Sequence, residues 1–91
     1  MRVTRSSRFK KDYKLAKRQQ KNLFLLRDVI EKLVNEQQIP EKFRDHKLTG
    51  ILKEYRELHL EPDWLLIYRV DENKEELKLA RLGSHSELYS K

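Results

Sequence analysis

Residues 55–68 read YRELHLEPDWLLIY, and this stretch predicts a β-hairpin. Two apolar-rich, partly alternating runs flank Pro62, and a proline followed by Asp63 suits the corner of a type I turn. The tip of this hairpin gathers an imidazole, two carboxylates and an indole within six residues, among them His59 and Trp64. A turn that only closed a sheet would not need these side chains. The hairpin therefore sets the fold and is the first candidate for a functional site.

The remaining elements follow from apolar spacing and capping residues. Before the hairpin, Ser6 or Ser7 can cap one helix and Asn22 can cap a second. The expected elements are an extended segment at 1–4, helices at 7–20 and 22–37, strands at 52–60, 64–70 and 77–82, and a helical turn within 83–89.

This order predicts a single α+β domain over residues 1–91. An N-terminal strand comes first, then a helical hairpin, then a three-stranded antiparallel segment packed against the helices. The two helices are nearly contiguous, so we expect them to run antiparallel. Within the first helix, Arg8 and Asp12 are spaced for an ion pair at i,i+4.

The composition excludes sites that depend on cysteine and argues against a membrane span. The chain has no cysteine, which excludes disulfides and thiolate zinc sites. No apolar run approaches the about 20 residues of a membrane span, and we expect a cytoplasmic protein with no membrane partner.

Positive charge is concentrated in one segment. Residues 1–21 hold nine Lys and Arg against one acid, a net charge of +8, whereas the other seventy residues carry −2. The segment is either a solvated helix face or a patch that meets nucleic-acid phosphates or an acidic protein.

All three histidines follow residue 45, at strand ends and in adjoining loops, where sites are commonly built. Histidine exchanges protons near neutral pH. RNA cleavage by its own 2′-hydroxyl needs such a base and acid, together with cations or donors that stabilise the phosphorane. The candidate acid/base residues are the histidines His46, His59 and His85, paired with one another or with a carboxylate. The candidate phosphate ligands are Lys47, Lys53, Arg56 and Arg81, and Trp64 and Tyr89 could stack on bases.

Each of these residues also has a purely structural interpretation. A histidine at a strand end commonly caps or lies on the surface, and Trp64 at the start of an apolar strand is typical of a core residue. No histidine pair has HxH or HxxH spacing, so we predict no metal site and no cofactor. Composition and spacing alone indicate a small basic α+β domain with a possible RNA site.

The chain resembles the YafQ branch of the RelE/ParE toxin superfamily. The resemblance rests on the segment 45–50, on H-x-E-P-D-W within 55–68, and on G-x-H-x-x-L-aromatic within 81–89, with the N-terminal FKKDYK and the helix pair also matching. Such toxins are ribosome-dependent endoribonucleases of type II toxin–antitoxin pairs. The resemblance implies metal-independent cleavage of mRNA codons in the ribosomal A site, with AAA-type codons favoured.

The resemblance also implies roles for individual residues. His46, Asp63 and His85 would be the leading acid/base groups, His59 would orient the site or hold the phosphate, and Trp64 and Tyr89 would position bases. Two positions depart from the family: it often has Phe where this chain has Tyr89, and the prototype has Asp where Glu57 stands.

The implied partners are the ribosome with its mRNA and an acidic, DNA-binding antitoxin that forms a hetero-oligomer with the toxin and carries the complex to promoter DNA. Two alternatives share the fold. One is a ParE-like toxin that poisons gyrase, which needs no acid/base set, and the other is a non-catalytic RNA-binding member.

Overall fold

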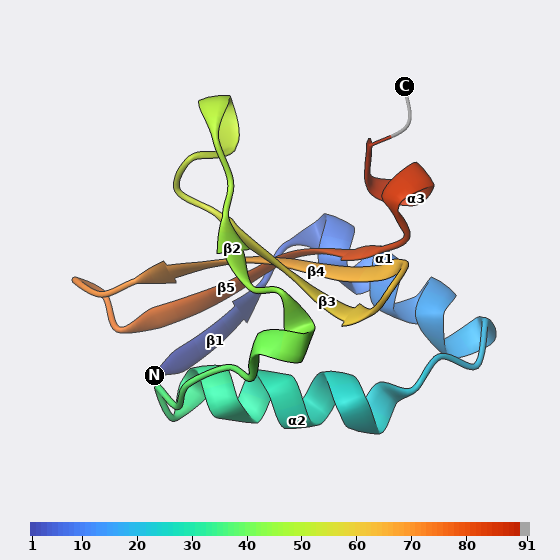
Figure 1. Ribbon diagram of the computed structural model, residues 1–91, viewed down its shortest axis with the longest axis horizontal. Coiled ribbons are helices and arrows are strands. Elements are labelled where there is room, and N and C mark those ends of the chain that lie inside the picture. The colour runs from blue at the N-terminus through green and yellow to red at the C-terminus, as the bar shows by residue number, and fades with distance from the viewer. Residues whose placement is uncertain (90–91) are drawn as a thin grey trace.

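Within the described part of the chain, five strands form one sheet in the order β1-β5-β4-β3-β2 (Figure 1). The computed structural model describes residues 1–89, and the strands are β1 (Arg2–Arg5), β2 (His46–Lys47), β3 (Arg56–Glu61), β4 (Trp64–Asp71) and β5 (Glu76–Gly83). β1 pairs with β5 in parallel, and the other neighbouring strands are antiparallel. The turn between β3 and β4 falls at Pro62 and Asp63, as the hairpin sequence predicts.

Over residues 1–89, three α-helices and two short 3₁₀ turns connect and cover the strands. They are α1 (Ser7–Arg18), α2 (Leu23–Val34), η1 (Glu41–Phe43), η2 (Gly50–Leu52) and α3 (His85–Tyr89). The predicted caps are confirmed: the Ser6 hydroxyl accepts the Phe9 N–H at 2.9 Å, and the Asn22 side chain accepts the Leu25 N–H at 3.1 Å.

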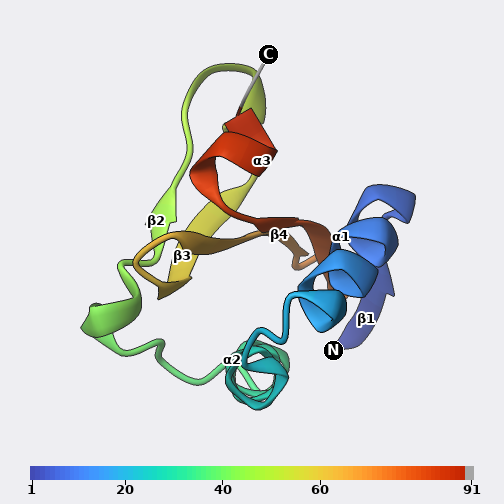
Figure 2. The ribbon, with the colours of Figure 1, turned by 90° about the vertical axis from the view of Figure 1, so that its right-hand side faces the viewer.

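The sheet separates α2 from α3. Figures 1 and 2 both place α2 below the sheet and the short α3 above it, while α1 lies beside β5. The apolar core fills the α1 and α2 side and includes Phe9, Ala16, Leu26, Val29, Leu33, Phe43, Leu58, Leu60, Trp64, Leu66, Tyr68, Leu77, Leu79 and Leu82. The α3 side is therefore the face on which polar side chains can gather.

Strand alternation decides which β3 residues reach that polar face. Leu58 is buried in the core, so its neighbours Glu57 and His59 point to the opposite side. His46 of β2 is the cross-strand partner of Glu57 and shares its face. A register shift between His59 and Glu61 interrupts the ladder directly after His59, and such irregularities often re-aim side chains next to sites.

The predicted α+β class, N-terminal strand and helical hairpin are confirmed, with differences in detail. The first hairpin strand begins at Arg56 because residues 50–55 form η2 and a turn. The two-residue strand β2 was not predicted, since so short an edge strand has no periodicity to read. Both long helices end two to three residues earlier than expected, where Gln20 and Glu36 adopt positive φ.

The predicted ion pair between Arg8 and Asp12 is wrong. Asp12 instead accepts from Arg81 Nε at 2.8 Å and from the Leu82 backbone N–H at 2.9 Å. A long-range partner with two donors replaces an exposed local pair, and the contact fastens α1 to β5.

Within residues 1–89, no helix has both the length and the apolar character that crossing a membrane would require.

Candidate active site

Three imidazole rings lie in a row on the polar face of the sheet. The ring centres of His46 and His59 are 6.2 Å apart, and those of His59 and His85 are 5.7 Å apart. The three residues come from β2, β3 and α3, so the fold brings together side chains separated by up to 39 positions. The side chains of His46 and His85 are half exposed, at 50% and 53%, whereas that of His59 between them is largely covered, at 13%.

Asp63 orients His85. One carboxylate oxygen of Asp63 accepts the His85 backbone N–H at 2.9 Å and the ring Nδ1 at 2.7 Å. A carboxylate only accepts, so Nδ1 carries the proton and Nε2 is left for a substrate. The hydrogen bonds from the His85 backbone and ring lower the pKa of Asp63, which is therefore ionised at neutral pH.

The sequence around His85 builds a local frame for this contact. Ser84 and Glu87 form a capping box: the Ser84 hydroxyl accepts the Glu87 N–H at 3.2 Å, and the Glu87 carboxylate accepts the Ser84 N–H at 2.8 Å. The first turn of α3 is thus fixed by neighbours in sequence, and Asp63 then fixes it to the β3–β4 turn.

His46 and His59 have their Nδ1 atoms turned to backbone carbonyls. Nδ1 of His46 lies 2.8 Å from the Arg44 oxygen, and Nδ1 of His59 lies 3.4 Å from the Pro62 oxygen. Because a carbonyl only accepts, each Nδ1 is the donor. Both Nε2 atoms lie 3.6 Å from Oε1 of Glu57.

Glu57 is the central residue that the sequence analysis did not assign to the site. It is only 6% exposed and is the one buried charged residue among residues 1–89. Its second oxygen, Oε2, accepts a hydrogen bond from the Tyr89 hydroxyl. The alternation of side chains along a strand could have predicted the place of Glu57. Glu57 and His59 are two residues apart in the predicted strand, so their side chains lie on the same face of the sheet.

Tyr89 lies at the end of α3, with its hydroxyl bonded to Glu57. The residue is 45% exposed, and its role in base stacking stays a prediction. Partial burial and the hydrogen bond to Glu57 raise the pKa of the Tyr89 hydroxyl, which therefore remains protonated and donating at neutral pH.

Trp64 requires a correction. Its side chain is 1% exposed and belongs to the hydrophobic core, with the Lys21 ammonium 6.0 Å from the ring centre. A fully covered indole has no face on which a base can stack. The structure therefore favours the core interpretation, and we place Trp64 among the residues that support the hairpin.

The basic residues expected to bind phosphate divide into two groups. Arg81 pairs with Asp12, and Arg56 pairs with Asp45 at 3.3 Å, so both guanidinium groups already serve internal ion pairs. Arg56 also alternates with Glu57 along β3 and points to the other face of the sheet. Lys47 and Lys53 are exposed, and their role in phosphate binding stays a prediction.

Among the residues that the structure describes, one group of side chains has the spacing to hold a cation. Ligand atoms of His46, Glu57 and His59 all lie within 4.8 Å of one another. The absence of a metal cofactor, which the sequence analysis expected, stays a prediction.

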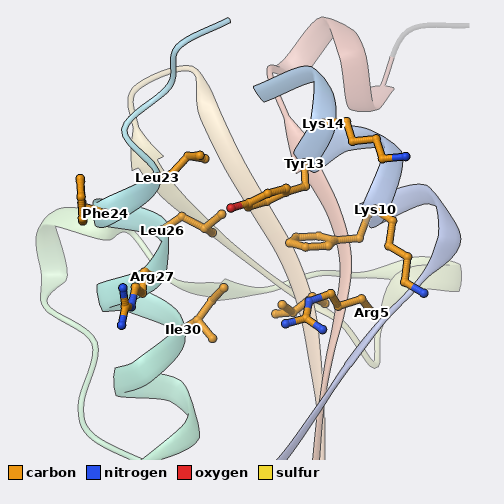
Figure 3. Close-up of a pocket in the computed structure, with 11 residues that line it drawn as sticks. Arg5, Lys10, Tyr13, Lys14, Leu23, Phe24, Leu26, Arg27 and Ile30 are labelled. Carbon is orange, nitrogen blue, oxygen red and sulfur yellow. The ribbon is translucent and has the colours of Figure 1, made fainter. Parts of the chain in front are cut away.

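A second feature, on the other side of the molecule, is a cavity of about 820 Å³ between α1 and α2 (Figure 3). Apolar side chains form its walls, among them Phe9, Tyr13 and Leu26, and Phe24 at its edge is 79% exposed. We call this cavity the helix groove. Basic side chains surround it, namely Arg5, Lys10, Lys14 and Arg27. The two helices run in opposite directions, as predicted, but splay apart enough to leave this space.

The whole described chain matches one family. The model of a bacterial toxin of type II toxin–antitoxin systems, YafQ, covers residues 1–90. This chain belongs to the YafQ toxin family. The mRNA interferase toxin YafQ of Escherichia coli K12 is 36% identical over 85 residues, which span 92% of this chain and 90% of that relative.

Solved structures of bacterial toxins share the fold. A metal-bound toxin from Helicobacter pylori has a TM-score of 0.93 at 43% identity, covering 98% of this chain and 99% of that one. YafQ in the E. coli DinJ–YafQ complex has a TM-score of 0.89 at 35% identity, covering 99% of this chain and all of that one. The predicted family is confirmed, and so is the RelE-like fold.

Proposed function

We propose that this YafQ-family chain is the toxin of a type II toxin–antitoxin pair and an mRNA interferase that cuts codons in the ribosomal A site. The observation that carries the proposal is the row of three imidazoles, at one end of which Asp63 accepts hydrogen bonds from His85. Its curated relatives of nearly full coverage are named mRNA interferases, which supports cleavage over the gyrase-poisoning and non-catalytic alternatives.

The proposed chemistry is transesterification by the RNA's own 2′-hydroxyl. A base removes the 2′ proton, the 2′ oxygen bonds to phosphorus, the bond from phosphorus to the 5′ oxygen breaks, and an acid protonates that oxygen. The products are a 2′,3′-cyclic phosphate and a free 5′-hydroxyl. No external oxidant, reductant or water enters this balance.

The geometry supports a different catalytic role for each histidine of the row. We assign His85 as the acid, because the Asp63 carboxylate bonded to Nδ1 stabilises its protonated ring and leaves Nε2 of a half-exposed side chain for the substrate. His46 is the base, because its Nδ1–H is held by the Arg44 carbonyl, its side chain is half exposed, and the Glu57 carboxylate 3.6 Å from Nε2 would stabilise the ring once it has taken up the proton. His59, between them and largely covered, holds the phosphate side of the site.

His46 and His85 are half exposed, so they can reach an RNA that is bound to a larger particle. A ribosome can present the codon and supply the remaining contacts, and the +8 charge of residues 1–21 suits rRNA phosphates. We place this reaction in the cytoplasm, where translation occurs. AAA-type codon preference belongs to the same proposal.

We further propose that an antitoxin binds the helix groove. Solved DinJ–YafQ complexes supply the precedent for a protein partner. Apolar walls ringed by four basic side chains suit one occupant, an amphipathic antitoxin helix with acidic flanks. The antitoxin would then carry the complex to promoter DNA.

Primer extension on a translated mRNA tests the proposed function. After induction of the wild-type chain, we expect in-frame cuts within codons, and after induction of His85→Gln at equal protein level we expect none. Growth arrest without cuts would contradict nuclease activity, and equal cuts with His85→Gln would contradict the assigned site.

A further inference from the structure

Glu57 divides its carboxylate between two sets of partners. Oε1 faces the Nε2 atoms of His46 and His59, and Oε2 receives the hydroxyl of Tyr89. A charge this well buried is expensive unless every oxygen is engaged. Tyr89 therefore completes the shell of a group that also contacts two of the three imidazoles.

The helix that carries Tyr89 is too short to be stable by itself. α3 has five residues, and isolated helices of that length do not persist in water. Its order depends on contacts at both ends: Asp63 accepts from His85 at the first residue, and Glu57 accepts from Tyr89 at the last. Two carboxylates of the β3–β4 hairpin thus hold the two ends of α3.

We propose that Tyr89 is a positioning residue whose hydroxyl, through Glu57, holds α3 against β3 and fixes His85 relative to His46 and His59. We call this hydrogen-bonded pair of Glu57 and Tyr89 the α3 latch. The role differs from base stacking, which needs the ring and not the hydroxyl. The catalytic part of this inference rests on the proposed nuclease function.

The latch explains why a tyrosine is useful at this position. Its phenol is a neutral donor, so it satisfies the buried carboxylate without adding a second charge beside the imidazoles. A phenylalanine would retain the ring but leave one buried oxygen of Glu57 without its donor.

A double-mutant cycle separates the latch from simple packing. In the wild-type background, Tyr89→Phe should lower kcat about tenfold with KM unchanged, since the stacking ring is retained. In the Glu57→Ala background the same substitution should have no effect, because its partner is gone. In the Glu57→Gln background the amide oxygen still accepts the phenol, so the tenfold loss should return.

Two results would overturn the proposal. One is a Tyr89→Phe variant that cleaves at the wild-type rate, and the other is an equal effect of Tyr89→Phe in all three backgrounds. Should Glu57→Ala fail to fold, the exchange of the Leu88 amide in Tyr89→Phe decides the proposal instead.

Hydrogen exchange tests the latch even if the chain does not cleave RNA. The Leu88 N–H donates to the Ser84 carbonyl at 3.0 Å inside α3 and reports on the order of that helix. Tyr89→Phe should speed its exchange about tenfold, while core amides such as that of Leu66 exchange as in the wild type. Unchanged exchange at Leu88 would contradict the latch, whereas absent cleavage in the wild type would contradict only the proposed function.

Discussion

His85 gives two hydrogen bonds to a single oxygen of Asp63, one from its backbone at 2.9 Å and one from ring Nδ1 at 2.7 Å. The first bond fixes the start of α3, and the second fixes the plane and tautomer of the imidazole. One carboxylate therefore sets both where His85 lies and which nitrogen it presents. The same arrangement of carboxylate, imidazole and reacting group recurs in enzymes that use histidine as an acid or base.

Replacing Asp63 tests this relationship. In Asp63→Asn the anion that stabilises the protonated His85 ring is lost, and we expect the rate of mRNA cleavage to fall about 100-fold. Thermal unfolding should change little, because Asp63 lies at the surface. The measurement is single-turnover cleavage on programmed ribosomes, beside Glu61→Gln as a control on the same hairpin. A wild-type rate for Asp63→Asn would contradict the assignment.

The pH at which Asp63 takes up a proton is a second prediction. Its pKa is lowered below the ordinary value of 3.8 by the bonds from His85. The stabilisation from this contact is therefore fully present above about pH 3.8 and is lost as the pH falls through the lower, folded-state pKa. Carboxyl ¹³C shifts followed by NMR should place the Asp63 midpoint below 3.8 in the wild type and nearer the ordinary value in His85→Ala. A midpoint above the ordinary value in the wild type would contradict the observed geometry.

The helix groove predicts a separation between antitoxin binding and catalysis. Phe24 is 79% exposed at the edge of the groove and lies on the side of the sheet opposite the histidines. We expect Phe24→Ala to weaken binding of the cognate antitoxin about 30-fold, an effect of about 2 kcal/mol, while cleavage by the free toxin is unchanged. Ile51→Ala is the matched control, because Ile51 is fully exposed but lies on η2. Equal losses for both variants, or none for Phe24→Ala, would argue against this docking surface.

The basic segment predicts a salt-dependent association with the ribosome. Lys11 and Lys17 are exposed on α1 and do not line the helix groove. Reversing both charges to Glu should weaken ribosome binding more at low salt than at high salt, because each lost phosphate contact reduces the slope of log K against log[salt] by about 0.9. Reversal of Lys42 and Lys74, which are exposed elsewhere, should leave the slope unchanged. A loss of binding that does not vary with salt would indicate misfolding instead.

Local sequence signals predicted much of this molecule because their physical causes are local. The caps at Ser6 and Asn22 depend on hydrogen bonds to residues three positions away, and the turn at Pro62 depends on backbone restriction. The residue types at the hairpin tip and after the last strand identified His59, Asp63 and His85, and the fold brings these three together.

Other features depend on contacts between distant segments and could not be read from neighbours. Arg81 looked available for phosphate, but its partner Asp12 lies 69 positions away. Trp64 is the first residue of β4 and follows polar residues in the sequence. Whether its side chain enters the core depends on which face of the sheet it points to. The α3 latch joins Glu57 to a residue 32 positions later, so it becomes visible only once α3 is placed over the sheet.

The most direct test of the account is cleavage of an mRNA whose scissile nucleotide lacks its 2′-hydroxyl. Programmed ribosomes carrying the favoured codon in the A site are mixed with the purified toxin, and RNA ends are mapped. Acid/base catalysis by the histidine row predicts that the unmodified codon is cut with a 2′,3′-cyclic phosphate end, that the 2′-deoxy codon is not cut, and that His85→Gln cuts neither. Cleavage of the 2′-deoxy codon at the wild-type rate would contradict attack by the 2′-hydroxyl and, with it, the roles assigned to His46 and His85.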